Sequence, residues 1–403
     1  MKTLVFNNSI GTAPEIIRSG GLVAVPTETV YGLAGNGLDP SAVEKIYEVK
    51  GRPAVKPLSI MVSGREAMDL YCTDVPDSAK KLADMFWPGP LTIVLSAKDI
   101  VPEIVRAGGK TVGLRCPACE LTLEALRRSG VPFAAPSANP SGEPSPKSAR
   151  AVLEYFDGSI DAVIDGGECT LGVESTLIDM SSKPYRILRQ GALSGETLSD
   201  ALADMMTVIG ITGPSGTGKT SALEYAGRCF PEGTCRVIDC DGLYHGLLES
   251  SPALRNELSD EFPGALEGDT ICRRKLGEIV FGDPVKLERL NEITHRHIVA
   301  ALKEILRGHA MNGGTAALID ASELIGSPAE SLCDITVSVL APRTERIRRI
   351  TARDGITEAE AIRRIDAQHD DAYYISHTDR YIMNDGSMDD FENEIKRIIK
   401  DMR

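Results

Sequence analysis

An unbroken phosphate-loop pattern lies near the middle of the 403-residue chain. It reads G-x-x-x-x-G-K-[ST], and its positions are Gly213, Pro214, Ser215, Gly216, Thr217, Gly218, Lys219 and Thr220. A short run rich in β-branched residues precedes it, so we expect a buried strand, the loop and then a helix. Lys219 would reach the β- and γ-phosphates of ATP, and the Thr220 hydroxyl would bind magnesium. A solvent turn without a ligand is the alternative, and the strand–loop–helix context argues against it.

The next predicted strand covers residues 236–241 and ends in two acids. These are Asp239 and Asp241. A carboxylate across from a phosphate loop can orient a nucleophilic hydroxyl or a magnesium ion. Capping of the following helix is the alternative, and it is stronger for Asp239 than for Asp241.

Two predicted helices of the second half carry further candidate groups. His295 lies on the helix expected over 287–301, where a histidine is more often packed or solvated than catalytic. Arg349 and Arg353 lie on the helix expected over 343–354. That helix would ordinarily be a solvated face, but in a phosphotransferase it can form a lid that brings guanidinium groups over ATP. Two further strands are expected at 316–321 and 335–340.

In the first half, cations and hydroxyls recur where predicted elements end. Strands are expected at 21–26, 58–62, 91–95 and 110–117, and a helix at 39–50. The helix begins at an N-capping Asp and presents two cations at a Gly-Pro turn. Separate loops would contribute Thr27, Thr29, Lys50, Arg52, Arg115, Ser137, Asn139, Ser175 and Arg189. Such a set suits a pocket for a polyanion and a small zwitterion.

The segment 135–146 is rich in Pro, Ser and Gly and predicts no regular structure. By composition alone, a flexible surface loop is the favoured interpretation. Its Ser137 and Asn139 nevertheless stand among the loops that carry cations, which argues that the segment forms part of the pocket.

Length and charge bound the organisation of the chain. A chain of 403 residues exceeds what one hydrophobic core usually supports, so we expect two domains. Before Thr207 there are 20 basic and 25 acidic residues, and from Thr207 onward there are 24 and 33. Neither half has the basic footprint of a tight nucleic-acid binder, so no strong direct nucleic-acid binding is expected. There is no apolar run of 18 residues and no secretory signal pattern, so we expect a cytoplasmic protein without membrane association.

The nine cysteines show no disulfide framework, and most should be free thiols. Cys116 and Cys119 form a CxxC that lacks a second pair at zinc-site spacing, so structural cysteines are favoured over metal or redox use. The histidines form no zinc motif, and we predict no zinc.

Residues 6–193 resemble a known family through a series of motifs. In chain order these are PTETVYGL, KGRP, KPLSI, FWPGPLTIVL, TVGLRCP, PSANPSGEPSP, GVESTLIDM and ILRQGA. They are similar to the YrdC/TsaC family of threonylcarbamoyl-AMP synthases. The resemblance implies a twisted, mainly parallel α/β sheet around a concave cavity. It also implies the conversion of L-threonine, bicarbonate and ATP into threonylcarbamoyl-AMP and pyrophosphate, with tRNA-modification proteins receiving the product.

The same resemblance assigns roles to individual residues. Because a threonine carbamate must attack the α-phosphorus of ATP, such a site has to hold several negative charges. The resemblance implies ATP contacts from Lys50, Arg52, Thr111, Ser137, Asn139, Ser145 and Arg189. Of these, Lys50, Arg52, Ser137 and Asn139 are also implied to be catalytic. On the threonine side it implies Thr27, Thr29, Arg115 and Ser175. Met61 stands where archaeal members often carry His.

The second half resembles dephospho-CoA kinase. The motifs are GITGPSGTGKT, VIDCD, RRKLGEIVFGDP, LNEITHRHI, LIDA, CDITVSVLAP, RRITARDGITEAEAIRRIDAQ and DRYIMNDGS. The resemblance implies a P-loop α/β/α sandwich that transfers the γ-phosphate of ATP to the ribose 3′-hydroxyl of dephospho-CoA. Asp241 would be the catalytic carboxylate next to that hydroxyl, Arg273 and His295 would lie near the acceptor, and Arg349 and Arg353 would lie in the lid.

This half departs from the family where the acceptor should bind. The usual D-x-P-L-L-x-E is replaced by a run with Ser322, Glu323 and Gly326, and the usual His-Pro becomes His295-Arg296. Another P-loop kinase, acting on a nucleoside or nucleotide, is therefore the alternative.

The two resemblances together predict a bifunctional enzyme with domains at 1–200 and 207–403. The rival is a binding protein in which an RNA-binding first half is joined to a degenerate ATP-binding scaffold. The acidic charge of both halves and the two intact sets of ATP-site residues favour catalysis.

Overall fold

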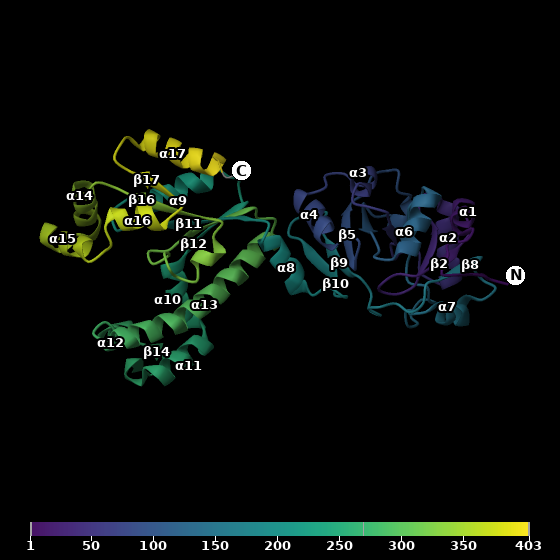
Figure 1. The fold of residues 1–403 in the computed structure, drawn as a ribbon, viewed down its shortest axis with the longest axis horizontal. Helices are drawn as coiled ribbons and strands as arrows, with labels where there is room; N and C mark the ends of the chain where they lie inside the picture. The colour runs from purple at the N-terminus through teal and green to yellow at the C-terminus, as the bar shows by residue number, and fades with distance from the viewer. Residues whose placement is uncertain (1, 269, 402–403) are drawn as a thin grey trace. The chain divides into compact units, whose positions relative to one another are not determined.

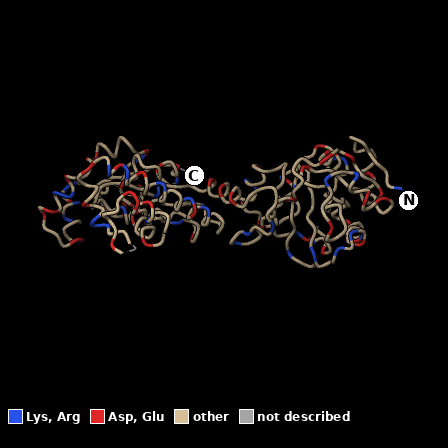
Figure 2. Tube along the Cα trace, turned by 90° about the horizontal axis from the view of Figure 1, so that it is seen from below, with Lys and Arg blue, Asp and Glu red and all other residues tan. Residues whose placement is uncertain are grey.

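The computed structural model describes residues 2–268 and 270–401, and the chain divides into two compact units, Met1–Leu202 and Ala203–Arg403 (Figure 1). Both units are α/β, as the sequence predicts. Acidic and basic residues are interspersed along the trace of both units (Figure 2). Within the described residues, no helix is long and apolar enough to cross a membrane.

The first unit is built on one sheet. Its strands are β1 Leu4–Asn7, β2 Val23–Val25, β3 Gly32–Asn36, β4 Ser59–Met61, β5 Leu91–Ser96, β6 Thr111–Arg115, β7 Phe133–Ala134, β8 Ala162–Asp165, β9 Thr176–Asp179 and β10 Arg186–Arg189. Their order is β1-β8-β2-β3-β7-β4-β6-β5-β9-β10. The pairs β1–β8, β2–β8, β4–β6 and β5–β9 are parallel, and the other neighbours are antiparallel.

The sheet is therefore mixed, and the expectation of a mainly parallel sheet was wrong. The connection from β2 to β3 explains one antiparallel pair. It covers only residues 26–31, whereas a parallel crossover needs roughly a dozen residues or more. The chain turns back there, and the turn carries Thr27 and Thr29.

The helix that presents Lys50 forms as predicted. Helix α2, Pro40–Lys50, begins at Asp39, whose side chain accepts a hydrogen bond from the Ser41 N–H. It ends at Gly51, which adopts the left-handed conformation (φ 56°) that favours glycine. The other helices of this unit are α1 Ala13–Arg18, α3 Ala67–Tyr71, α4 Asp77–Phe86, α5 Glu103–Arg106, α6 Glu120–Ser129, α7 Ala149–Phe156 and α8 Gly195–Ala203.

The Pro/Ser-rich segment 135–146 has little regular structure but is held at several points. Leu33 N–H donates to the Pro136 carbonyl, Ala138 N–H to the Tyr31 carbonyl, and Tyr31 N–H to the Pro146 carbonyl, at 2.8–2.9 Å. Ala138 is fully buried. Residues 141–144 are exposed, but the rest of the segment is held against the β3 region by hydrogen bonds that its composition does not reveal.

The second unit has a five-stranded parallel sheet. Its strands are β11 Thr207–Thr212, β12 Cys235–Asp239, β15 Ala316–Asp320, β16 Ile335–Leu340 and β17 Arg380–Met383, in the order β12-β15-β11-β16-β17. Two short strands, β13 Leu266–Glu267 and β14 Thr270–Ile271, form a separate antiparallel pair. Because all five strands run in one direction, their carboxyl ends meet at a single edge, where open α/β sheets bind ligands.

Helices cover this sheet and build a second apolar cluster beside it (Figure 1). They are α9 Lys219–Arg228, α10 Cys240–Ser250, α11 Pro252–Glu261, α12 Arg273–Val280, α13 Pro284–Met311, α14 Arg343–Asp354, α15 Glu358–Asp366, α16 Asp371–His377 and α17 Met388–Asp401, with 3-10 turns η1 Pro263–Ala265 and η2 Glu330–Leu332. Helices α9 and α17 pack on the sheet, whereas α10 to α13 enclose their own core. The helix expected over 287–301 is part of the longer α13.

Candidate functional site

The first unit contains a cavity of about 400 Å³ lined mainly by polar residues. Among the residues predicted for a site, those that line it are Lys50, Arg52, Arg115, Ser137, Asn139, Ser145, Ser175 and Arg189. They come from the end of α2, the end of β6, the 135–146 segment, the start of β9 and the end of β10. The fold thus brings these four cations, together with Lys56 and several hydroxyls, from distant parts of the chain to one cavity.

Lys50 is buried (3% exposed) and ties α2 to the Pro/Ser-rich segment. Its ammonium donates to the backbone carbonyls of Ser137 and Asn139. Burial, assisted by the nearby positive charge of Arg52, lowers the pKa of Lys50 to about 8. Burial also lowers the pKa of Arg52, which donates to the Lys56 and Pro57 carbonyls.

Asn139 offers this cavity an acceptor. Its Nδ2 donates to the carbonyls of Pro140 (3.0 Å) and Glu143 (2.5 Å), which uses both amide hydrogens. Its Oδ1 is buried and has no hydrogen-bond partner among the described residues. Because phosphate oxygens also accept, this geometry does not present the Asn139 side chain as a donor to a triphosphate.

Arg115 is held by groups at the turn after β2. Its Nη2 donates to Glu28 Oε1 and Thr29 Oγ1, each at 2.7 Å, and its Nε donates to the Gly89 carbonyl at 3.3 Å. The side chains of Arg115 and Glu28 are 7% and 9% exposed, so this is a buried ion pair. The sequence places the Glu28 carboxylate beside the hydroxyls of Thr27 and Thr29 in the PTETVYGL motif, but it did not assign Glu28 a role in the site.

Three predicted residues do not line the cavity. Thr29 is fully buried and accepts the hydrogen bond from Arg115, and Thr27 Oγ1 bonds to Thr29 Oγ1 (2.9 Å) and to the Val30 carbonyl (2.6 Å). Thr111 is the first residue of β6 and Arg115 the last. Because a strand rises about 3.3 Å per residue, roughly 13 Å separates these two positions, which explains why only Arg115 reaches the cavity.

Ser175 and Arg189 join β9 to the end of β10. Arg189 Nη2 donates to the Ser175 carbonyl (2.9 Å) and to Ser175 Oγ (3.0 Å), and Ser175 Oγ lies 2.8 Å from Thr92 Oγ1. Arg189 also pairs with Glu174, which accepts a further hydrogen bond from Ser145 Oγ at 2.9 Å. Glu174 was another omission, although it belongs to the GVEST motif.

In the second unit, the phosphate loop lies between β11 and α9 as predicted. Gly213, Gly216 and Gly218 have φ of 134°, 81° and 98°, where only glycine is free of strain. A Cβ on Gly213 would lie 2.3 Å from the Val339 carbonyl oxygen, and one on Gly218 would lie 2.4 Å from Asn384 Nδ2. The glycines of the motif therefore permit close packing of the loop against the neighbouring backbone and Asn384.

Lys219 folds back over this loop, and its ammonium donates to the Gly213 carbonyl at 2.7 Å. Burial lowers its pKa, while the charges of Asp320 and Asp241 oppose that shift. Asp320 ends β15 and lies beside Asp239 in register; burial raises its pKa. Asp320 is a missed candidate, and its position at the end of a predicted strand was the available signal.

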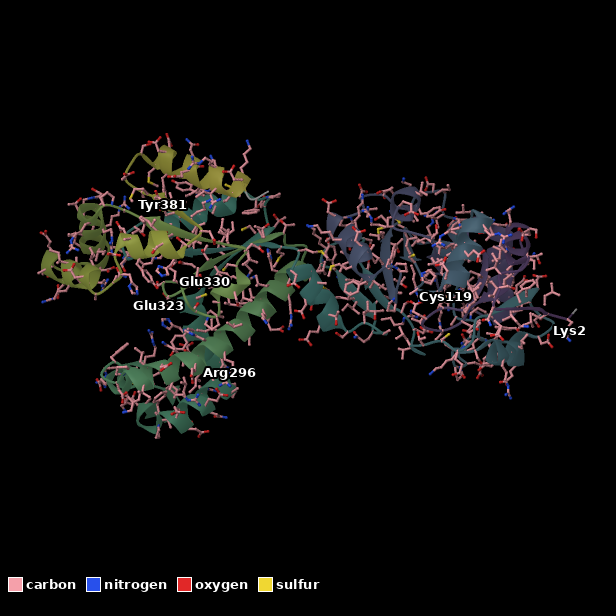
Figure 3. The ribbon with its side chains drawn as sticks, in the orientation of Figure 1. Lys2, Cys119, Arg296, Glu323, Glu330 and Tyr381 are labelled. Atoms are coloured by element: carbon pink, nitrogen blue, oxygen red, sulfur yellow. The ribbon has the colours of Figure 1, made fainter. Side chains whose placement is uncertain are left out.

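Asp239 serves mainly as a helix cap, because its side chain accepts from the Asp241 N–H at 3.0 Å. Asp241 instead lines a cavity of about 200 Å³ with His295, Ser322 and Glu323. Burial lowers the pKa of His295, and the charge of Glu323 opposes this. Figure 3 labels Glu323 and Arg296 in this unit.

Two further residues lie outside the 200 Å³ cavity: Arg273, which was predicted to lie near the acceptor, and Arg296, which departs from the family pattern. Arg273, at the start of α12, does not line it, although its charge lowers the pKa of the lining residue Tyr244 against the effect of burial. Arg296 pairs with Glu257 at 2.7 Å and lines a neighbouring cavity of about 700 Å³ with His295 and Gly326. The family departures thus surround the place where an acceptor could bind.

Helix α14 contacts the phosphate loop and is not simply a solvated face. Arg349 Nη1 lies 3.2 Å from the Thr217 carbonyl oxygen. Arg346, only 5% exposed, donates to the Ser215 carbonyl at 3.0 Å and to Gln368. Arg353 is exposed and pairs with Asp354 at 2.7 Å.

A magnesium ion fits the chemistry of the phosphate-loop site. Thr220 is exposed in the first turn of α9, and carboxylates end two neighbouring strands. The described residues contain no group of three or more metal-ligating side chains. Magnesium does not require one, because it usually takes one or two protein oxygens together with phosphates and water.

Comparison with known proteins finds a family match for each half. The Sua5/YciO/YrdC family, described as "Telomere recombination", matches residues 15–191, and the dephospho-CoA kinase family matches residues 207–390. The threonylcarbamoyl-AMP synthase of Pyrococcus abyssi is 45% identical over 217 residues, which are 54% of this chain and 64% of that protein. The Bacillus subtilis enzyme of the same name is 42% identical over 47% of this chain and 55% of its own length. The chain therefore matches less than two thirds of the length of either relative.

A Mycobacterium tuberculosis relative is 33% identical, over 49% of this chain and 90% of its own length. Among solved structures, P. abyssi Sua5 complexed with L-threonine is 33% identical with a TM-score of 0.49, covering 80% of this chain and 93% of that one. Dephospho-CoA kinase from Campylobacter jejuni is 24% identical with a TM-score of 0.32, covering 49% and 98%. The chain belongs to the Sua5/YciO/YrdC family through residues 15–191, and its residues 207–390 match the model of the dephospho-CoA kinase family.

Proposed function

We propose that the chain is a bifunctional cytoplasmic enzyme with a synthase domain at 1–200 and a kinase domain at 207–403. The first domain would convert L-threonine, bicarbonate and ATP into threonylcarbamoyl-AMP, pyrophosphate and water, and would supply tRNA-modification proteins. The second would transfer the γ-phosphate of ATP to the 3′-hydroxyl of dephospho-CoA, which leaves ADP and coenzyme A.

The observation that carries the first proposal is the convergence of Lys50, Arg52, Arg115 and Arg189 on one cavity. ATP and threonine carbamate both bring negative charge, and the attack on the α-phosphorus concentrates more of it on the phosphate oxygens. Positioned cations stabilise that charge. Arg115, oriented by Glu28 and Thr29, is the group we assign to the threonine carboxylate, because a guanidinium suits a planar anion.

Pyrophosphate release tests the synthase proposal. The full-length protein should release pyrophosphate from ATP only when L-threonine and bicarbonate are both present. Lys50→Ala should abolish this release, because it removes a buried charge and frees the carbonyls of Ser137 and Asn139. Lys219→Ala is the matched control, and it should leave the release intact. Release that persists without threonine would refute the assignment.

The second proposal rests on the phosphate loop and on Asp241 in the adjoining cavity. Lys219 would bind the β- and γ-phosphates, and Arg349, which contacts the phosphate loop, would stabilise the transferred group. Asp241 would accept the proton of the attacking hydroxyl. Thr220 would hold magnesium, which neutralises phosphate charge when bound.

Dephospho-CoA-dependent ADP formation tests the kinase. Lys219→Ala and Asp241→Asn should each abolish it, whereas Lys50→Ala should spare it. The acceptor cavity carries Glu323 and Ser322 in place of the family's usual residues, so adenosine and other nucleosides belong in the same substrate panel. ADP formation with a nucleoside but not with dephospho-CoA would identify a different P-loop kinase.

A further inference from the structure

The synthase cavity contains a carboxylate bound to two residues assigned to the nucleotide. Glu174 Oε1 accepts a hydrogen bond from Ser145 Oγ at 2.9 Å, and Oε2 accepts one from Arg189 Nη1. The charge of Glu174 also reaches Lys50 and Arg52, since it raises the pKa of both against the larger effect of burial. The carboxylate therefore lies among the cations that an ATP molecule would need.

The backbone at Glu174 is fixed, although its side chain is not enclosed. The Ala192 N–H donates to the Glu174 carbonyl at 3.0 Å. Gly191 packs so closely that a Cβ there would lie 2.4 Å from that carbonyl oxygen. The ion pair itself is open to solvent, with Arg189 41% and Glu174 35% exposed. Rotation of the Glu174 side chain can thus release Ser145 and Arg189 without moving the backbone.

A carboxylate and a phosphate oxygen compete for the same donors. Both accept charge-assisted hydrogen bonds from guanidinium and hydroxyl groups. An exposed ion pair contributes little free energy, so a ligand with several negative charges can displace the carboxylate from its partners. If the carboxylate kept its place, it would repel the phosphates.

We propose that Glu174 is a positioning residue that occupies phosphate contacts while the synthase site is empty and must swing away when ATP binds. This proposal rests on the synthase function proposed above. Glu174 therefore acts as an internal competitor of the nucleotide: it keeps Ser145 and Arg189 in position, and it weakens binding of any ligand whose phosphates require them. Removal of its charge should tighten binding of phosphate-bearing ligands and leave phosphate-free ones unaffected.

The test measures ligand affinity by calorimetry in the full-length protein with Lys219→Ala, so that ATP reports on the first domain. Glu174→Gln should lower the Kd for ATP and for pyrophosphate by about three- to tenfold. The difference in Kd between this variant and its parent should become smaller as the salt concentration increases. The Kd for adenosine should not change. Glu143→Gln is the matched control, because it removes the same charge from the same cavity. No bond joins its carboxylate to Ser145 or Arg189 among the described residues, so its effect should be smaller.

The outcomes distinguish a failure of the Glu174 proposal from a failure of the proposed synthase function. Unchanged or weaker ATP binding in Glu174→Gln, with an unchanged unfolding midpoint, overturns the role of Glu174 as a competitor. An equal gain in Glu143→Gln overturns it too, because the effect would then be one of net charge. If Lys50→Ala in the same background fails to weaken ATP binding, the synthase assignment fails, and the Glu174 proposal fails with it.

Discussion

At the scale of single residues, Lys50 links the sequence motif to a measurable pH effect. Its motif predicted a phosphate contact, and the structure adds that the ammonium is buried against two carbonyls with a pKa of about 8. Its charge is therefore complete only below that pH. The unfolded chain holds the proton up to a pKa near 10.4, so this group adds stability as pH rises from about 8 to 10.

The same loss of a proton from Lys50 should weaken ATP binding as pH rises, whereas it increases the stability of the fold. In a Lys219→Ala background, we expect ATP affinity at the first site to fall by up to about tenfold per pH unit above pH 8. Lys50→Arg is the control, because arginine stays charged and removes the titration. A wild-type affinity that stays level between pH 7 and pH 9.5 would contradict this prediction.

The buried pair of Arg115 and Glu28 should matter more than the exposed pairs of the same unit. Glu28→Ala leaves a guanidinium buried without its partner, so we expect a loss of about 3–5 kcal/mol in the free energy of unfolding. The Glu154 pair with Arg150 is largely exposed, and Glu154→Ala should cost at most about 1 kcal/mol. Denaturant unfolding of the two variants checks this, and equal losses would refute it.

At the scale of elements, the phosphate loop shows why a motif can succeed as a prediction. Its glycines are required by positive φ values and by close contacts, and both follow from a strand that turns directly into a helix. Helix α14 was harder to predict. Its arginines would ordinarily indicate a solvated face, and only packing showed that Arg346 and Arg349 contact the loop.

Two glycine substitutions near α9 should have opposite effects. Gly218→Ala places a Cβ 2.4 Å from Asn384 Nδ2 at a φ of 98°, so we expect a loss of about 1–3 kcal/mol and weaker ATP binding. Gly227→Ala meets open space inside the same helix and should stabilise the domain by about 0.5–1 kcal/mol. Thermal unfolding with and without ATP distinguishes them, and two changes of the same sign would contradict the loop geometry.

At the scale of the whole molecule, the chain is two compact units with separate cavities. The second unit has apolar clusters built only from its own residues. A ligand that binds one folded unit stabilises it by mass action, by about 2.7 kcal/mol at a concentration of 100 Kd.

We therefore expect ligands to stabilise the units separately. In calorimetry, L-threonine should raise the melting temperature of one transition and leave the other unchanged, and Arg115→Ala should remove that shift. Dephospho-CoA should raise the melting temperature of the other transition only, which we assign to the second unit. A single transition that moves with either ligand would show instead that the units unfold together.

The sequence by itself determined the two families, the phosphate loop, most strands near the sites and the capped helix that ends at Lys50. These features depend on local patterns: apolar periodicity, a capping Asp and glycines at fixed spacing. It could not determine the mixed sheet, since strand direction depends on how distant segments pair.

Only the tertiary structure decided which candidates share a cavity. Thr111 and Arg115 belong to the same strand, but only Arg115 lines the cavity, because the two lie at opposite ends. The contacts of Glu28 with Arg115 and of Glu174 with Arg189 join residues that are 87 and 15 positions apart along the chain, so the sequence alone did not indicate them. A motif names residue types at short spacing, whereas burial and pairing depend on contacts that form only when the chain has folded.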